Sequence, residues 1–317
     1  MDLSKVAAEV AERSQARVEQ DYSLARYTTY RLGGKAALYL EPRSARDLEV
    51  LGEALRHAPE RDRPPMLILG RGSNLVISDH GFDGIVVRMG AAFSWLRPAG
   101  DRDLVAGAST PLPQVANWAA RRSLSGMEFG VSIPGSVGGA VHMNAGAHGG
   151  EIADVLTGVT IFKLQSLEVA SPAVSTLGFA YRRSNLTGDD LVLDATFSLR
   201  PDEPQQIRER MEKFREHRAA TQPGAAQNAG SVFKNPSEGS AGRLVEQAGL
   251  KGFRVGGASV SQLHANFMIA GSGATAQDVY DLVRIVRSKV HSATGVDLEP
   301  EIRFVGPFED RPLEAHR

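Results

Sequence analysis

Ser231 has the setting that most suggests chemistry in this chain of 317 residues. It follows a glycine in the run Asn-Ala-Gly-Ser-Val-Phe-Lys-Asn-Pro, residues 228–236, which is typical of a short β-like segment that Pro236 stops. A serine hydrolase needs Gly-x-Ser-x-Gly between a strand and a helix, but Phe233 occupies the place of the second glycine. If Ser231 reacts, proton donation to a carbon centre is therefore favoured over acyl transfer. A plain edge strand is the alternative interpretation.

Two glycine-rich segments could bring the backbone close to a ligand. The first, Gly-Arg-Gly-Ser-Asn at 70–74, could turn N–H groups toward phosphate oxygens. It is not a Rossmann-type fingerprint, because Leu75 replaces the third glycine and a strand is predicted to follow; it also lacks the Gly-Lys-Ser/Thr ending of a P-loop. The second, at 133–147, indicates backbone pressed against something flat or anionic or, alternatively, a turn with close strand packing.

Hydrophobic patterning predicts the elements that hold these segments. The predicted strands lie at 36–40, 66–69, 85–87, 104–106, 157–163 and 191–198. The predicted helices lie from Ser44 to about 55, at 112–123, at 205–219 and from Thr275 to a stop at Gly295. The first strands and helix predict a small α+β unit over about residues 20–85.

Composition limits the classes of function. The net charge of −1 favours neither nucleic acid nor an anionic membrane as a partner. The chain has no cysteine, which excludes disulfides and thiolate metal sites and suits a reducing cytosol. Its 8 histidines show no metal-binding spacing. Residues 1–17 lack the apolar core of a signal peptide, and no stretch approaches 18 apolar residues, so we expect a cytoplasmic protein without membrane insertion.

The motifs together resemble the UDP-N-acetylenolpyruvoylglucosamine reductase (UDP-N-acetylmuramate dehydrogenase) family, flavoenzymes of bacterial wall synthesis. The matches are Tyr-Thr-Thr-Tyr-Arg-Leu-Gly-Gly at 27–34, the two glycine loops and the run around Ser231, and they extend from about Thr28 to Gly306. The resemblance implies an α+β chain with the vanillyl-alcohol-oxidase/PCMH-type FAD-binding fold. It divides the chain into FAD-binding subdomains at 1–85 and 86–203 and an α+β substrate-binding domain at 204–317.

The resemblance also implies the cofactors. Non-covalent FAD would lie with its pyrophosphate on the first glycine loop and its ribityl chain and isoalloxazine along the second, and NADPH would be the hydride donor. The implied cofactor-binding residues are Gly70, Arg71, Gly72, Ser73, Asn74, Leu75, Pro134, Gly135, Ser136 and Gly139.

Two further catalytic residues follow from the resemblance. Tyr-Arg-Arg-Ser at 181–184 matches the family's Tyr-Arg-x-Ser, which implies Arg182, and Leu-Glu-Pro-Glu at 298–301 matches Leu-x-x-Glu, which implies Glu301. The family's substrate is an enol ether conjugated to a carboxylate. Arg182 would stabilise the charge that develops there, Glu301 would act as a protonated donor or orient Arg182 or water, and Ser231 would supply the proton. Without the resemblance, Arg182 and Glu301 would be interpreted as surface residues.

The implied contacts to the nucleotide-sugar substrate are Tyr181, Asn235, Lys251 and His264. The chain departs from the common family pattern at Gln227, Leu263 and Ala270. Arg182 and Ser231 are only 49 positions apart, which resembles the family's second type, the one without an extra tyrosine-bearing loop.

Two other functions compete with this interpretation. A flavin enzyme that oxidises an alcohol or hydroxy acid would not need Gly-Ser-x-Phe-Lys-Asn-Pro, which is present here. A non-catalytic regulator that binds flavin or a nucleotide sugar would be expected to lose at least one of Arg182, Ser231 and Glu301, and all three are present.

Overall fold

A computed structural model describes residues 1–224, 227–237 and 239–312. The chain passes repeatedly between two compact units: the first comprises 1–21, 37–71 and 84–217, and the second 22–36, 72–83 and 218–317. The division into three segments at 85 and 203 stays a prediction.

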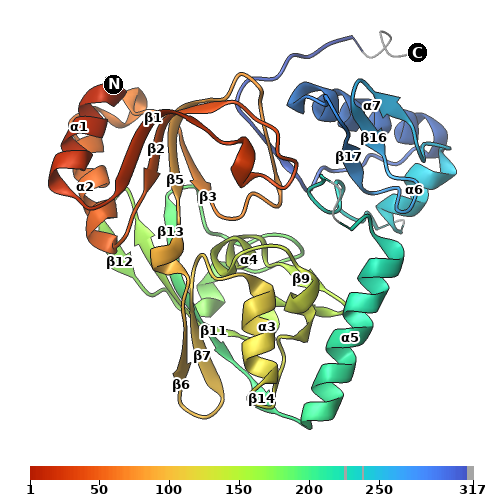
Figure 1. Cartoon of the computed structure of the whole chain (residues 1–317), viewed down its shortest axis with the longest axis horizontal. Helices are drawn as coiled ribbons and strands as arrows, with labels where there is room; N and C mark the ends of the chain where they lie inside the picture. The colour runs from red at the N-terminus through yellow and green to blue at the C-terminus, as the bar shows by residue number, and fades with distance from the viewer. Residues whose placement is uncertain (225–226, 238, 313–317) are drawn as a thin grey trace. The chain divides into compact units, whose positions relative to one another are not determined.

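A four-stranded sheet and two helices open the first unit. The strand order is β1 (Arg17–Ser23), β2 (Lys35–Glu41), β5 (Phe82–Arg88) and β3 (Met66–Leu69), with β3 parallel to β5. Helices α1 (Leu3–Arg13) and α2 (Ala45–Leu55) pack together beside it (Figure 1). The predicted strands and the capping box of Ser44 and Asp47 are confirmed. Helix α1 was not predicted, although Val6 and Val10 lie one helical turn apart and are buried.

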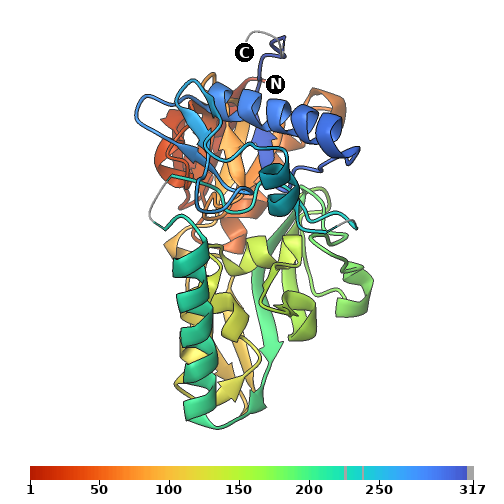
Figure 2. The same cartoon turned by 90° about the vertical axis from the view of Figure 1, so that its right-hand side faces the viewer.

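A second, five-stranded antiparallel sheet supports the remaining helices of this unit. Its order is β12 (Glu168–Ala170), β11 (Leu156–Lys163), β13 (Asp190–Ser198), β7 (Asp103–Gly107) and β6 (Leu96–Ala99). The helices are α3 (Leu112–Ala120), α4 (Val137–Met143) and α5 (Pro204–Thr221). Helix α5 runs beside α3, where Arg215 donates to Asn117 at 3.1 Å (Figure 2). Two short antiparallel pairs complete the unit: β8 (Leu124–Ser125) with β14 (Arg200–Pro201), and β9 (Gly146–Ala147) with β10 (Gly150–Glu151).

The second unit has its own core around a three-stranded antiparallel sheet, β15 (Arg254–Val255), β16 (Ala258–Val260) and β17 (Met268–Ala270). Helices α6 (Ala241–Gln247) and α7 (Ala276–Thr294) pack on it (Figure 1). Strand β4 (Leu75–Ile77) pairs in parallel with β18 (Arg303–Val305). Tyr30 is fully buried in this core, donates to the Met268 carbonyl at 3.1 Å, and has its pKa raised by that burial.

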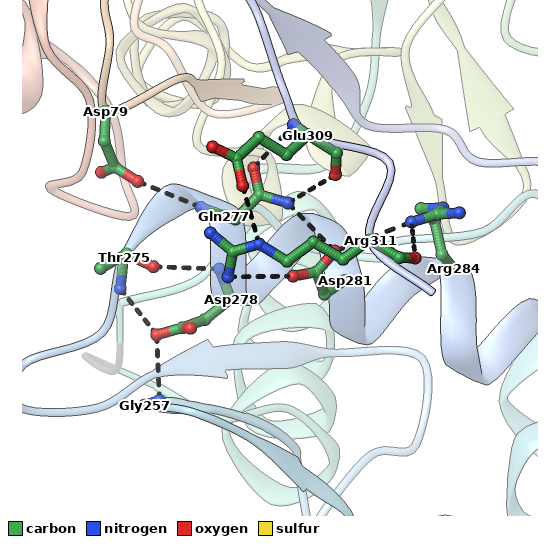
Figure 3. A network of polar contacts seen from close by, with 9 residues as sticks. All are labelled: Asp79, Gly257, Thr275, Gln277, Asp278, Asp281, Arg284, Glu309 and Arg311. Atoms are coloured by element: carbon green, nitrogen blue, oxygen red, sulfur yellow. Dashed lines mark hydrogen bonds and ion pairs between the residues drawn. The ribbon is translucent and has the colours of Figure 1, made fainter. Parts of the chain in front are cut away.

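A polar network fixes the start of α7 (Figure 3). Thr275 and Asp278 form the predicted capping box, and Asp79, from the loop after β4, accepts from the first two N–H groups of the helix at 3.1 Å each. The side chain of Gln277, in the same first turn, exchanges two hydrogen bonds with the backbone of Glu309 (Figure 3). These contacts bind both the β4 loop and the segment after β18 to the helix. Within the described residues, no helix has the length and apolar character needed to cross a membrane.

Candidate active site

The two glycine loops meet in the first unit, although they are more than 60 residues apart in sequence. Arg71 Nε donates to the Pro134 carbonyl at 3.1 Å. A Cβ atom on Gly70 would lie only 2.7 Å from Ser136 Oγ, so a side chain at 70 would have to displace the Ser136 hydroxyl. The structure thus brings together the parts of both predicted cofactor loops that lie in this unit.

The second glycine loop continues into α4, which the sequence did not predict. The helix begins against the segment that follows β7: Val137 N donates to Thr110 O at 2.9 Å, and Gly138 N to Ala108 O at 2.8 Å. A Cβ on Gly138 would lie 3.2 Å from the Ala108 Cβ, so close packing explains that glycine. It does not explain Gly139, which is exposed and whose Cβ would meet only Ser136 Oγ, at 3.7 Å.

The open backbone at Gly139 fits a flat ligand. No atom of the described residues would prevent a side chain at this position, so packing within the protein does not account for the glycine. A ring system lying on the loop would occupy the space of that side chain and would account for it. The same pair of loops supplies the backbone of Gly70, the hydroxyl of Ser136 that faces it, and the cation of Arg71, which bonds to Pro134 O. These features fit the isoalloxazine and phosphate groups of FAD better than a structural turn alone.

The rest of the first loop lies in the second unit. Gly72 has a φ of +60°, and a Cβ there would lie 2.0 Å from the Tyr27 carbonyl, so only glycine fits. Gly72 O also accepts from Thr29 N at 3.3 Å. The 27–34 motif therefore packs directly on the loop. Ser73 and Asn74 are half-buried, and Leu75 begins β4, the strand expected in place of a Rossmann helix.

Arg182 sits in a tight turn with a φ of +55°, a left-handed conformation that is uncommon for arginine. Ala180 and Arg183 close the turn with reciprocal backbone hydrogen bonds. Arg182 itself donates to Gly146 O at 2.8 Å, and its guanidinium lies 4.8 Å from the Tyr181 ring centroid. Tyr181 is 50% exposed. Backbone in such a sparsely populated region often marks a functional site.

Two side chains bind this turn to the end of α4. Ser184 Oγ donates to His142 O at 2.8 Å, and Asn144 Nδ2 donates to Ala180 O at 3.2 Å. Asn144 is fully buried and also accepts from Ala153 N at 3.0 Å. The sequence analysis did not identify Asn144. Its place at the end of the glycine-rich segment, where a left-handed residue ends α4, was the available signal.

Ser231 and Glu301 are brought together in the second unit by backbone pairing. Glu301 N donates to Val232 O at 2.8 Å, and Lys234 N donates to Glu299 O at 2.9 Å. Asn74 Nδ2 adds a bond to Glu301 O at 3.0 Å, which joins the first glycine loop to the same segment. The pairing is one irregular bridge, between Phe233 and Pro300, rather than the regular strand that the sequence indicated.

The other side of the Ser231 segment is occupied by Asn266, which the sequence analysis did not single out. Its carbonyl accepts from Val232 N at 2.8 Å, and its buried side-chain amide makes two bonds to the backbone of Phe233. Asn266 N donates to His264 Nδ1 at 3.2 Å. That bond requires Nδ1 to be unprotonated, so a neutral His264 carries its proton on Nε2.

The remaining residues predicted to bind substrate lie in the second unit with other contacts. Asn235 Oδ1 accepts from Ala241 N at 3.0 Å, at the start of α6, and Lys251 pairs with Glu246 at 2.8 Å. Among the positions that depart from the family pattern, Leu263 is 51% exposed, and Gln227 forms a bridge with Ala270.

The first unit thus holds the joined glycine loops and, separately, an arginine in a left-handed turn, and the second unit holds the paired backbone of the Ser231 and Glu301 segments. In the described part of the chain, no group of three or more histidine and acidic side chains could hold a metal ion.

Comparison with known proteins defines the class of this protein first. Residues 36–165 match the model of an FAD-binding domain, so the protein is an FAD-dependent oxidoreductase. Residues 222–305 match the model of the UDP-N-acetylenolpyruvoylglucosamine reductase C-terminal domain.

Full-length relatives then define the family. The chain is 43% identical to UDP-N-acetylenolpyruvoylglucosamine reductase 2 of Symbiobacterium thermophilum, covering 93% of this chain and 94% of that protein. It is 36% identical to the Bacillus pumilus enzyme over 96% of this chain and 99% of the relative. The chain belongs to the UDP-N-acetylenolpyruvoylglucosamine reductase family.

A solved structure confirms the expected fold class. The crystal structure of the Thermus caldophilus reductase has a TM-score of 0.77 at 35% identity, covering 92% of this chain and 100% of that one. The α+β fold, with an FAD-binding part of the vanillyl-alcohol-oxidase/PCMH type and a C-terminal domain, is therefore as the sequence predicted.

Proposed function

We propose that this protein reduces UDP-N-acetylglucosamine enolpyruvate to UDP-N-acetylmuramate, with NADPH as hydride donor and non-covalent FAD, in peptidoglycan synthesis. The observation that carries the proposal is the pairing of the Ser231 and Glu301 segments beside the loop of Asn74, in a chain of this family. FAD, when bound, supplies the hydride transfer between NADPH and the substrate. The protein would thereby serve cell-wall formation, cell shape and division in the cytoplasm.

The cofactor would be held by both glycine loops. Gly70, Gly72 and Gly139 allow the backbone to approach it, and Arg71 and Ser136 add polar groups. The other residues proposed to bind FAD are Ser73, Asn74, Leu75, Pro134 and Gly135.

The substrate's chemistry assigns the roles of the catalytic residues. Its alkene is conjugated with a carboxylate, so reduction places negative charge on the carbon next to the carboxylate. Ser231 would donate its hydroxyl proton to that carbon. Arg182 would bind the carboxylate, because a guanidinium keeps its charge and can donate two parallel hydrogen bonds. Glu301 would act in its protonated form as a donor, or by orienting Arg182 or water.

Nucleotide-sugar binding would fall to Tyr181, Asn235, Lys251 and His264. Lys251 is a diphosphate partner that would exchange its pairing with Glu246 for the substrate. His264 would present Nε2–H as a donor, since Nδ1 is occupied by the N–H of Asn266. The short spacing between Arg182 and Ser231 supports the second type of the family. The partners of the protein are then small molecules, with neither nucleic acid nor membrane insertion.

The test is anaerobic stopped-flow absorbance of the purified, FAD-loaded protein. NADPH should bleach the flavin band, and the enolpyruvyl nucleotide sugar should restore it with one equivalent of reduced product. A flavin that NADPH reduces but that this substrate does not reoxidise would refute the proposed reaction while leaving the FAD assignment intact.

A further inference from the structure

We propose that Asn266 is a positioning residue for proton donation by Ser231, an inference that rests on the proposed function. Ser231 lies on a segment without regular strand structure, in which only Phe233 forms an isolated bridge. Asn266 takes the place of the missing neighbouring strand and so fixes where the serine hydroxyl lies.

Backbone pairing holds one side of the segment. Val232 O accepts from Glu301 N at 2.8 Å, and Lys234 N donates to Glu299 O at 2.9 Å. These bonds use alternate residues, as in an antiparallel ladder, and leave the N–H and the carbonyl of Phe233 pointing to the other side. The N–H of Val232 also bonds on that other side, to Asn266 O, although in a regular ladder it would face the same way as its own carbonyl.

Asn266 satisfies all three of these groups. Its backbone carbonyl accepts from Val232 N at 2.8 Å, its Oδ1 accepts from Phe233 N at 2.9 Å, and its Nδ2 donates to Phe233 O at 2.8 Å. The side-chain amide thus carries one donor and one acceptor in the spacing of a peptide group. Asn266 is 3% exposed and Phe233 is 1% exposed, so water cannot replace these bonds.

These three bonds, here called the Asn266 clamp, act on Ser231 because the preceding residue is held by a local bond, from Gly230 N to Asn228 Oδ1 at 2.9 Å, and by no side-chain packing of its own. Gly230 has a φ of +77°, and a Cβ there would contact nothing within 4 Å. The serine is therefore held between a glycine in open space and two residues bound by Asn266. Proton transfer requires the hydroxyl within hydrogen-bond reach of the reacting carbon. A displacement of about 1 Å can cost about 100-fold in rate.

The same residue connects Ser231 to the proposed substrate contact. Asn266 N donates to His264 Nδ1, and the His264 ring packs edge-on against Phe267 with centroids 4.8 Å apart. A change in the Asn266 backbone would therefore move both the proton donor and His264.

Two variants of nearly equal size test the role. Asn266→Asp keeps the acceptor but turns an oxygen toward Phe233 O, whereas Asn266→Leu removes both groups. Each variant should be reduced by NADPH at the wild-type rate and reoxidised about 10- to 100-fold more slowly. For Asn266→Asp the deficit relative to wild type should shrink as the pH falls, because the protonated carboxyl again offers one donor and one acceptor. For Asn266→Leu the deficit should not depend on pH.

Val286→Ala is the matched control, because it removes buried volume from α7, in the same core, without touching a hydrogen bond of the segment. If reoxidation in both Asn266 variants falls no further than in Val286→Ala at equal thermal stability, the positioning role is wrong. It is also wrong if the Asp and Leu deficits follow the same pH dependence.

A measurement on the wild-type protein keeps the inference testable if neither variant folds. The amide protons of Val232 and Phe233 should exchange with D₂O as slowly as core amides of α7, although they belong to no regular strand. Exchange at the rate of an open loop would overturn the clamp. This measurement needs no substrate, so it tests the hydrogen bonds of Asn266 independently of the proposed reaction. Failure of the proposed reaction would show differently, as a reduced wild-type flavin that the nucleotide sugar does not reoxidise.

Discussion

Replacing Gly139 with valine should weaken FAD binding without destabilising the fold. A Cβ at this position meets only Ser136 Oγ at 3.7 Å, an ordinary contact, and the residue lies inside α4 on an exposed face. Glycine is about 1 kcal/mol less favourable than alanine in a helix, and valine at most about 0.7 kcal/mol. The variant should therefore unfold at the wild-type temperature or slightly above it.

Its effect on the cofactor should be much larger. If the isoalloxazine lies on this backbone, the branched side chain takes its place, and overpacking of this kind costs about 1–3 kcal/mol. That corresponds to about 5- to 150-fold weaker binding of FAD, since about 1.4 kcal/mol is tenfold. Titration of the apoprotein with FAD, followed by quenching of flavin fluorescence, measures the dissociation constant directly.

The neighbouring glycine provides the matched control. A Cβ on Gly138 would lie 3.2 Å from Ala108 Cβ and 3.3 Å from its carbonyl, so Gly138→Val should cost about 1–3 kcal/mol of stability. The two variants should thus separate: one loses stability, and the other loses affinity for FAD. A folded Gly139→Val protein that binds FAD with wild-type affinity would refute the assignment of this face to the flavin.

Three further predictions concern the proton donor, a helix start and pH. Ser231→Ala should be reduced by NADPH at the normal rate but reoxidised about 10²–10⁴-fold more slowly in stopped flow, and wild-type reoxidation would exclude the proton-donor role. Asp79→Ala should lower the free energy of unfolding by about 1–2 kcal/mol, because the carboxylate accepts two N–H bonds at the start of α7. Asp79→Asn should lose less stability, and an Asp79→Ala protein that unfolds at the wild-type urea concentration would contradict the prediction. Burial alone would raise the pKa of Glu128, but its hydrogen bonds, above all with Arg210 at 2.7 Å, lower it below the ordinary 4.5. The stability that the ionised carboxylate adds is then present in full above pH 4.5 and disappears as the pH falls through the lower pKa of the folded state. In urea unfolding, Glu128→Gln should therefore lower the free energy of unfolding by about 1–3 kcal/mol at pH 7, and this loss should shrink toward pH 3.

Local patterns were sufficient to predict much of the secondary structure. The capping boxes at Ser44 and Thr275 and the stop at Gly295 depend on bonds within a few residues, so the sequence alone specified them, and the structure has all three. The same holds for the strands at 66–69 and 156–163, whose apolar runs permit little else. The resemblance of four ordered motifs also sufficed to indicate the family.

Tertiary structure decided the features that depend on distant partners. Helix α4 forms through a glycine-rich segment because its first N–H groups bond to the residues that follow β7, a contact that no local propensity encodes. Gly138 and Gly139 are adjacent and chemically identical, yet one packs on Ala108 and the other lies open. Likewise the sequence indicated a strand at Ser231, but the backbone there is completed by the side chain of Asn266, 33 residues from its partner Phe233. Which residue supplies a missing hydrogen bond is determined by the folded chain, because burial removes water as the alternative partner.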